Sequence, residues 1–120
     1  MQFIKKLPHK VEKPWGWELW IALTDSYVGK ILHINSGESL SLQYHKIKDE
    51  SIFVLNGTLK VDIKENGELK EIFLKVGDCL RIPPLTIHRF KSDKDCDIIE
   101  VSTPHLEDVV RLEDKYGRIK

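Results

Sequence analysis

The side chains of Gln43, His45, Glu50 and His88 have the types and the spacing of a metal site. Side chains alternate along a strand, so Gln43 and His45 share one face of a strand expected over 39–45, while Glu50 and His88 each begin a further strand. Imidazole and carboxylate ligands together suit zinc, which we favour, and also iron, manganese, cobalt and nickel. The alternative is that the histidines are hydrogen-bonded core residues and that Gln43 is a packing polar group.

Ligands on separate strands meet only if the sheet closes on itself. Short runs rich in Ile, Leu, Val and Phe recur along the chain, and turn pairs such as Asn66 and Gly67, which tolerate positive φ, separate them. This pattern predicts an all-β antiparallel sandwich or barrel. A weak helical period over 106–113 predicts a short helical tail. The expected strands are 29–34, 39–45, 51–55, 58–64, 71–75, 79–82, 87–91 and 97–103.

The composition excludes several classes of function. The chain has 120 residues with 19 basic and 19 acidic side chains, which suits one domain and argues against binding nucleic acid or a membrane through a basic surface. The first residues contain no apolar run long enough for a signal peptide, so we expect none, and no stretch approaches the roughly 20 apolar residues of a membrane span. Cys79 and Cys96 form no CxxC pair. We therefore expect a cytoplasmic protein with free thiols.

Two motifs resemble those of the cupins. The first comprises Gly37, Gln43, His45, Glu50 and Gly57, and the second comprises Gly77, Pro83, Pro84 and His88. The resemblance implies a double-stranded β-barrel, or jelly roll, whose motifs place metal ligands inside the barrel. It divides a single domain, 1–120, into an N-terminal arm (1–26), a barrel (27–104) and a C-terminal tail (105–120). Leu85 stands in place of a usual Gly.

A narrower resemblance, to the cupin domain of type II mannose-6-phosphate isomerases, covers 13–118. A Gln-x-His pattern is normal in that family, so the resemblance implies that Gln43, His45, Glu50 and His88 hold the metal. In that family the domain follows a GDP-mannose pyrophosphorylase domain, whereas we expect it to stand alone here. The matching segments are 13–16, 40–43, 57–58, 82–83, 88–89, 100–101 and 108–118.

The residues around the metal set depart from that family. Its first motif is rich in His and Arg where this chain has 46–49, and a His follows the Glu where this chain has Ser51. Arg81 stands where an aromatic residue is usual, and Ser102 replaces a usual Gln. The metal set is therefore intact while its surroundings are altered, which bears on the specificity for mannose 6-phosphate more than on the fold.

The resemblance implies aldose–ketose isomerisation of a sugar phosphate through an enediolate. Such an enzyme polarises a carbonyl group, which a divalent metal does as a Lewis acid, and moves a proton between adjacent carbons, which a carboxylate can carry. We expect Glu100 to be that carboxylate and Lys30 to be a second catalytic residue that faces the barrel. The alternative for Glu100 is an internal salt bridge, for instance to Lys30.

A phosphate group needs cationic partners, and the planar fork of arginine suits it. We expect Arg81, beside the second motif, and Arg111 and Arg118, in the family-like tail, to bind the substrate. Taken singly, each of these side chains is more often a solvated surface charge.

Three tryptophans, Trp15, Trp17 and Trp20, lie close together near the start of the chain. We expect them to pack or to form the seam of a homodimer. Other functions are open at this point: a non-catalytic sugar-binding cupin, or a cupin epimerase acting on a nucleotide-linked sugar. A cupin dioxygenase is less favoured, because such enzymes usually hold iron mainly through histidines and Gln43 replaces one. Fold alone does not choose among these functions.

Overall fold

A computed structural model describes residues 3–119, so the domain limits predicted at residues 1 and 120 lie outside the described residues. The described chain contains strands and no helix, and hence no helix that could cross a membrane. The strands are β1 (His9–Lys13), β2 (Gly16–Leu23), β3 (Val28–Ile34), β4 (Leu42–Tyr44), β5 (Glu50–Asn56), β6 (Leu59–Glu65), β7 (Glu68–Leu74), β8 (Cys79–Ile82), β9 (His88–Lys91), β10 (Cys96–Ser102) and β11 (Val110–Glu113).

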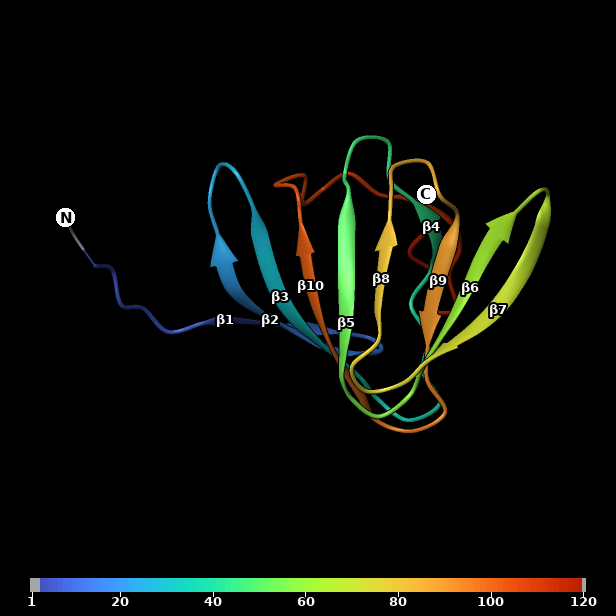
Figure 1. Ribbon diagram of the computed structural model, residues 1–120, viewed down its shortest axis with the longest axis horizontal. Coiled ribbons are helices and arrows are strands. Elements are labelled where there is room, and N and C mark those ends of the chain that lie inside the picture. Colours follow the sequence, from blue (N-terminus) through green and yellow to red (C-terminus); the bar gives the residue numbers. More distant parts are fainter. Residues whose placement is uncertain (1–2, 120) are drawn as a thin grey trace.

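These strands form two antiparallel sheets that face each other (Figure 1). The six-stranded sheet has the order β1-β2-β3-β10-β5-β8, and the five-stranded sheet has the order β11-β4-β9-β6-β7. Segments far apart in the sequence therefore lie side by side, such as β3 beside β10 and β4 beside β9. The predicted all-β sandwich is confirmed. The turn predicted at Asn66 and Gly67 joins β6 to β7 as a hairpin, with φ angles of 51° and 79°.

The predicted helical tail is wrong. Residues Val110–Glu113 form β11, which pairs with β4 and places Arg111 opposite Gln43. Val110 is β-branched and favours a strand, and β4, at the edge of the sheet, offers it unpaired backbone groups. Pairing with the sheet therefore outweighs the weak helical period of the sequence.

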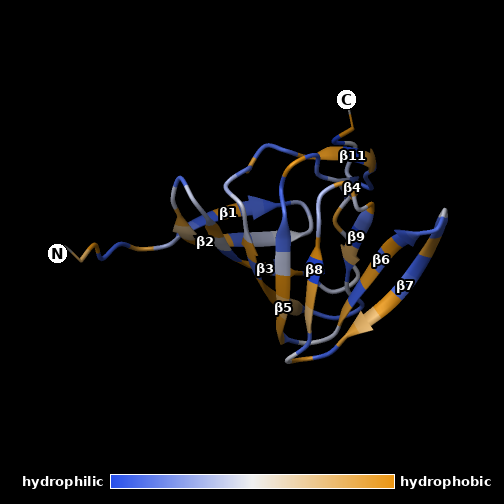
Figure 2. Cartoon of the chain, turned by 45° about the horizontal axis from the view of Figure 1, so that its top comes forward, coloured by the Kyte–Doolittle hydropathy of each residue, from blue (hydrophilic) through white to orange (hydrophobic). Residues whose placement is uncertain are grey.

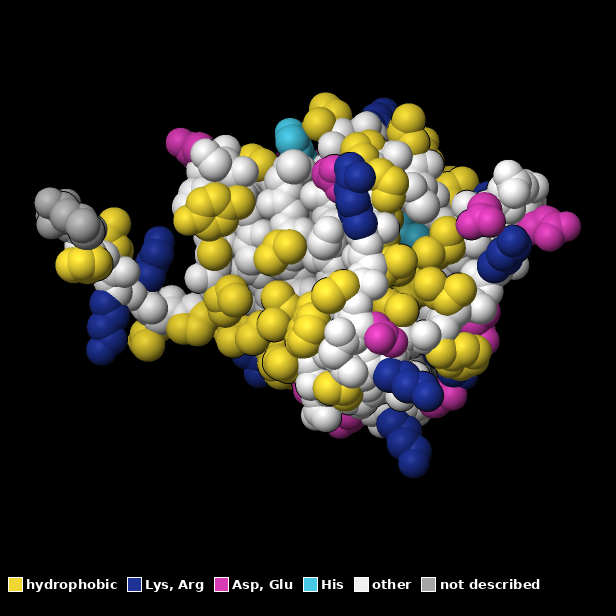
Figure 3. All heavy atoms as spheres, viewed as in Figure 1, with side chains coloured by type: hydrophobic (Ala, Val, Ile, Leu, Met, Phe, Trp, Pro, Cys, Tyr) yellow, Lys and Arg dark blue, Asp and Glu magenta, His cyan; other side chains and the backbone are white. Residues whose placement is uncertain are grey.

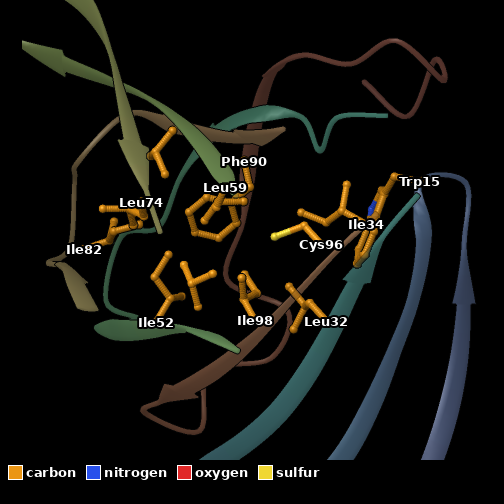
Figure 4. Packing of buried hydrophobic residues seen from close by; sticks show 12 residues of the cluster. Trp15, Leu32, Ile34, Ile52, Leu59, Leu74, Ile82, Phe90, Cys96 and Ile98 are labelled. Atoms are coloured by element: carbon orange, nitrogen blue, oxygen red, sulfur yellow. The ribbon is translucent and has the colours of Figure 1, made fainter. Parts of the chain in front are cut away.

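The space between the sheets is apolar at one end and charged at the other. On β3 the inward side chains are Ile34, Leu32 and then Lys30, and on β10 they are Ile98 and then Glu100, all of them buried. Figure 4 shows the apolar end, where side chains of both sheets meet around Phe90 and Leu59. Figure 2 shows the change along β5, which passes from blue at its start to orange. The same alternation that builds the core therefore also directs ionisable groups inward at one end. The twelve buried residues of the apolar cluster are Trp15, Leu32, Ile34, Ile52, Val54, Leu59, Val61, Leu74, Ile82, Phe90, Cys96 and Ile98.

Leu85, which stands where cupins usually have Gly, keeps the backbone conformation that favours Gly. Its φ is 70°, and its N–H donates to the carbonyl of His45 at 2.7 Å. The side chain is 68% exposed, so packing does not compensate for the left-handed conformation. This hydrogen bond connects the loop before β9 to His45. The left-handed conformation of Leu85 therefore goes together with a fixed position of this loop.

Replacing Leu85 with Gly is expected to raise the free energy of unfolding by about 1 kcal/mol, because a left-handed backbone costs other residues roughly 1–2 kcal/mol. Leu85→Ala keeps the strained conformation and should change stability by less than about 0.5 kcal/mol. Denaturant unfolding followed by circular dichroism measures both variants. A Gly variant no more stable than the Ala variant would show that the backbone is not strained.

Candidate metal centre and cavity

A cavity of about 320 Å³ opens at the charged end, between the two sheets and the C-terminal segment. His45, Glu50 and His88 lie in it, all buried, with ligand atoms within 4.8 Å of one another. His88 Nε2 is 3.2 Å and His45 Nε2 is 3.6 Å from Glu50 Oε1. The three residues are at most 43 positions apart in the sequence. They come together from the loop before β5, the start of β5 and the start of β9.

The second ring nitrogen of each histidine contacts a backbone carbonyl. His45 Nδ1 is 2.5 Å from the carbonyl oxygen of Asp108, and His88 Nδ1 is 2.8 Å from that of Thr86. A carbonyl only accepts hydrogen bonds, so Nδ1 bears a hydrogen, and Nε2 is the ring nitrogen that faces Glu50 in the cavity. Metal-binding histidines are held in this way, because the outer hydrogen bond fixes both tautomer and ring orientation.

Glu50 is the strongest sign that the site accommodates a cation. Both of its carboxylate oxygens are buried and have no hydrogen-bond partner among the described residues. Oε1 lies 3.6 Å from Nε2 of His45 and 3.2 Å from Nε2 of His88, so three atoms of types that bind metal ions converge in the cavity. Burial opposes ionisation of Glu50, but contacts with His45, His88 and Lys48 outweigh it and hold the pKa of Glu50 well below its usual range. A divalent cation fits this donor set.

Gln43, the fourth predicted ligand, lies beside this group. It pairs directly with His88 across β4 and β9. Its amide nitrogen donates to Ser41 Oγ at 3.1 Å and to the Ser41 carbonyl at 3.3 Å. Only the amide oxygen of the side chain is then available as a ligand, and the residue lines the cavity.

The sequence analysis missed Lys48, which is buried at the centre of the charged end. Its Nζ lies 3.3 Å from Glu50 Oε2 and 3.3 Å from Glu100 Oε2. Burial opposes the charge of Lys48, but Glu100 and Glu50 outweigh it and raise its pKa. Lys48 lies two residues before Glu50, so extending the strand alternation backwards by one step would have predicted that it faces inward.

Glu100 is buried, as its position in the strand predicts. Burial and the nearby charge of Glu50 raise the pKa of Glu100. Its salt bridge runs to Lys48 and not to Lys30. Glu50 and Glu100 contact the same ammonium group, so only the Lys48 side chain separates a second carboxylate from the group of His45, Glu50 and His88.

Lys30 lines the same cavity and forms a separate pair with Glu18, which sequence reasoning also missed. Lys30 Nζ is 3.1 Å from Glu18 Oε1 and lies 4.9 Å above the Trp20 ring. Trp20 donates its indole N–H to the same Glu18 oxygen at 2.9 Å. Burial opposes ionisation of Glu18, but Lys30 and the Trp20 hydrogen bond outweigh it and lower its pKa.

Two of the three predicted phosphate-binding arginines reach the cavity. Arg111 lines it, and its Nε is buried with no hydrogen-bond partner among the described residues. Arg118 also lines it, and its guanidinium contacts Asp114 at 2.7 and 3.0 Å. Arg81 does not line it: β8 turns Ile82 inward and Arg81 outward, where Arg81 pairs with Asp49 at 2.6 Å.

The C-terminal segment fixes one wall of the site. The carboxylate of Asp108 accepts hydrogen bonds from the backbone N–H groups of Lys46, Ile47 and Lys48 at 2.7–3.0 Å, and these bonds lower its pKa to about 2. The carbonyl of Asp108 meanwhile accepts from His45. Asp108 therefore fixes both the orientation of the His45 ring and the position of the loop that carries Lys48.

Comparison with known proteins matches residues 2–114 to the family described as "Mannose-6-phosphate isomerase C-terminal". The mannose-1-phosphate guanylyltransferase of Escherichia coli K12 is 37% identical over 126 residues, covering 95% of this chain and 24% of that protein. The alginate biosynthesis protein AlgA of Pseudomonas putida is 32% identical and covers 91% of this chain and 23% of that protein. The chain thus spans about a quarter of the length of these relatives.

Solved structures share the fold at low sequence identity. The capsular polysaccharide assembling protein CapF from Staphylococcus aureus has a TM-score of 0.77 at 18% identity, covering 91% of this chain and 35% of that one. KdgF from a Halomonas species has a TM-score of 0.67 at 20% identity, with coverages of 80% and 86%. Oxalate decarboxylase from Bacillus subtilis has a TM-score of 0.75 at 14% identity, with coverages of 93% and 33%. These likenesses show the fold alone.

Replacing Lys48 with Met is expected to lower the free energy of unfolding of the metal-free protein by about 3–5 kcal/mol, because it leaves Glu50 and Glu100 buried without their shared cation. Lys48→Arg keeps the charge and serves as the matched control. Urea unfolding in the presence of a chelator measures both. Equal stability of the Met and Arg variants would contradict the bridging role of Lys48.

Proposed function

The chain belongs to the mannose-6-phosphate isomerase C-terminal family, whose members have a cupin fold, and from this premise we propose that it is a metal-dependent sugar-phosphate isomerase. The proposed reaction interconverts an aldose and a ketose in the cavity between the two sheets. One observation supports it above the others: a set of buried metal ligands adjoins, through Lys48, a second buried carboxylate. Homologous guanylyltransferases are about four times as long as this chain. The activity of those whole proteins is therefore not part of the proposal.

The residues that would hold the metal are His45, Glu50 and His88, with the amide oxygen of Gln43 as a fourth ligand. Zinc remains our favoured ion for this donor set. A divalent cation bound here supplies Lewis-acid polarisation of the substrate carbonyl. The clustering of the three buried side chains and the hydrogen bonds that hold both imidazole rings in place support this assignment.

Glu100 is the residue we assign to proton transfer. In the proposed reaction its carboxylate takes the proton from carbon 2 of the aldose and returns it to carbon 1, while the hydroxyl proton on carbon 2 moves to the carbonyl oxygen. Atoms balance without any oxidant or reductant. Lys30 faces the same space from β3 and pairs in register with Glu100, so it is placed to orient the sugar hydroxyls.

Arg111 and Arg118 are the proposed partners of the phosphate. Both line the cavity from the C-terminal segment, and Lys13 is a further cationic side chain of the lining. The buried Nε of Arg111 lacks a hydrogen-bond partner among the described residues, and a phosphate oxygen would supply one. Arg81 is not part of this proposal, because its guanidinium is paired with Asp49 outside the cavity.

We expect the metal-loaded protein to exchange the carbon-2 proton of an aldose phosphate with solvent deuterium, measured by NMR across a panel of hexose and pentose phosphates. Glu100→Gln should retain metal and lower the exchange rate about 100-fold or more, since general acid–base groups contribute roughly 10²–10⁴-fold. Glu107→Gln, at another carboxylate of the cavity lining, is the control and should exchange normally. Saturable binding of a sugar phosphate without proton exchange would contradict the isomerase proposal and favour a sugar-binding cupin.

His88→Ala is expected to abolish stoichiometric metal binding, because it removes one of three clustered donors. His105→Ala, whose ring contacts Thr103 outside the cluster, should bind metal like the parent protein. Metal analysis after dialysis and calorimetric titration with zinc measure both variants. A His88→Ala protein that binds zinc as tightly as the control would refute the ligand assignment, whatever its activity.

A further inference from the structure

The three tryptophans expected to pack together or to form one seam do not share a face. Trp15 is in the core, and Trp17 lies outside, stacked on His33. Trp20 lines the cavity, where it belongs to a buried polar group on the wall formed by β2 and β3. The proposed reaction uses only one member of this group, which leaves the other two without a role.

The group consists of Glu18, Trp20 and Lys30, and its three contacts form a closed ring. Lys30 Nζ and the indole nitrogen of Trp20 both lie near Glu18 Oε1, at 3.1 and 2.9 Å, and Lys30 Nζ lies 4.9 Å above the Trp20 ring. Charged side chains on the face seen in Figure 3 project into solvent, whereas Lys30 and Glu18 are 7% and 9% exposed. The register of β2 against β3 also shifts directly after Trp20, and such bulges are common beside active sites.

Stability alone does not account for this ion pair. A buried ion pair is often no more stabilising than apolar side chains of similar volume. Glu18 pairs in register with Leu32, which is a core residue, so an apolar side chain would suit its position. Lys30 pairs in register with Glu100, yet its ammonium group contacts Glu18 instead. The pair therefore presents two opposite charges side by side at the cavity wall, where packing does not require them.

Both charged groups have hydrogen-bonding capacity left for a molecule in the cavity. Glu18 Oε2 takes part in neither of the contacts above, and Glu18 and Lys30 both line the cavity. An ammonium group has three hydrogens, of which the contact with Glu18 uses one. Burial opposes ionisation of Glu18, but Lys30, the Trp20 hydrogen bond and Lys13 outweigh it and lower its pKa, so Glu18 is a charged acceptor.

We propose that Glu18 and Lys30 together bind one hydroxyl group of the sugar phosphate, and that Trp20 positions Glu18 for this contact. The inference rests on the proposed function, because it assumes a sugar phosphate in the cavity. A hydroxyl group both donates and accepts, so it can donate to Glu18 Oε2 and accept from Lys30 Nζ. Other ligand groups suit the pair less well, because Glu18 repels a phosphate and Lys30 repels an amine.

The position of this hydroxyl follows from the two ends of the substrate. The metal is assigned to the carbonyl end and the arginines to the phosphate, and Glu18 and Lys30 belong to the six-stranded sheet, across the cavity lining from Arg111 on β11. The hydroxyl therefore belongs to carbon 3, 4 or 5 of a hexose 6-phosphate. Glu18 is a specificity-determining residue in this scheme, and Trp20 is a positioning residue.

Calorimetric titration of the zinc-loaded full chain with a hexitol 6-phosphate tests the proposal, because a hexitol has no carbonyl group and does not isomerise. The probes are the complete hexitol 6-phosphate and its 3-deoxy, 4-deoxy and 5-deoxy analogues. We expect one deoxy analogue to bind the parent protein about 10-fold or more weakly, because it leaves two charged groups without their partner. The ratio of the two dissociation constants is the measured quantity.

Glu18→Ala should bring this ratio close to one, and Glu18→Gln, which keeps the shape but not the charge, should lower it in part. Trp20→Phe keeps the ring beneath Lys30 but lacks the N–H group, so it should also lower the ratio. The matched control is Glu107→Ala, at another carboxylate of the cavity lining, and it should keep the ratio of the parent protein. Circular dichroism melting checks that each variant folds.

An unchanged ratio in the folded Glu18 variants overturns the inference, as does a parent protein that binds all four probes equally or binds none. Glu18 variants that bind every probe more weakly by one common factor show a purely structural role, which also overturns it. A parent ratio in Trp20→Phe overturns the role of Trp20. Deuterium exchange tests the isomerase separately: exchange with an unchanged ratio contradicts only the inference, and a changed ratio without exchange contradicts only the isomerase.

Discussion

Two imidazole rings and a carboxylate face one another at the charged end of this sandwich, and much of the structure serves that arrangement. Each imidazole hydrogen contacts a carbonyl on the far side of its ring, one from Asp108 and one from Thr86. The C-terminal segment must therefore lie against the loop before β5, and pairing of β11 with β4 holds it there. Leu85 accepts a left-handed backbone for the same purpose, because its N–H contacts the carbonyl of His45. A divalent cation is a group that suits this set of two imidazoles and a carboxylate.

The charges of the cavity are consistent with this account. Three buried carboxylates, Glu18, Glu50 and Glu100, face two buried ammonium groups, Lys30 and Lys48. Burial and the charge of Glu50 raise the pKa of Glu100, which limits the negative charge deep in the cavity, while cationic arginines of the C-terminal segment lie in the rest of its lining. A divalent cation suits the first region and a phosphate suits the second. Fixed charges of opposite sign at the two positions would orient a sugar phosphate along the cavity without large movements of the chain.

Strand alternation allowed much of the cavity lining to be predicted from the sequence. It places Glu50, His88, Lys30 and Glu100 inward, and all four are buried in the structure. The same rule, applied one step before β5, would have found Lys48, and applied to Ile82 it would have turned Arg81 outward. The tail could not be predicted this way, because a weak helical period says nothing about a distant strand edge. Glu18 was missed for a related reason: its pairing with Lys30 depends on the register of β2 against β3, which only the folded sheet sets.

The central claim is that His45, Glu50 and His88 form one metal centre, and the most direct test is an anomalous scattering measurement at the zinc edge on crystals grown with zinc. The account predicts one strong peak per chain, about 2.0–2.1 Å from Nε2 of both histidines and about 2.0–2.2 Å from a Glu50 oxygen. A chain with no peak at this position, and with Glu50 hydrogen-bonded directly to the two rings, would contradict it. The buried histidines would then be core residues held by their neighbours, and the cavity would need a different chemistry.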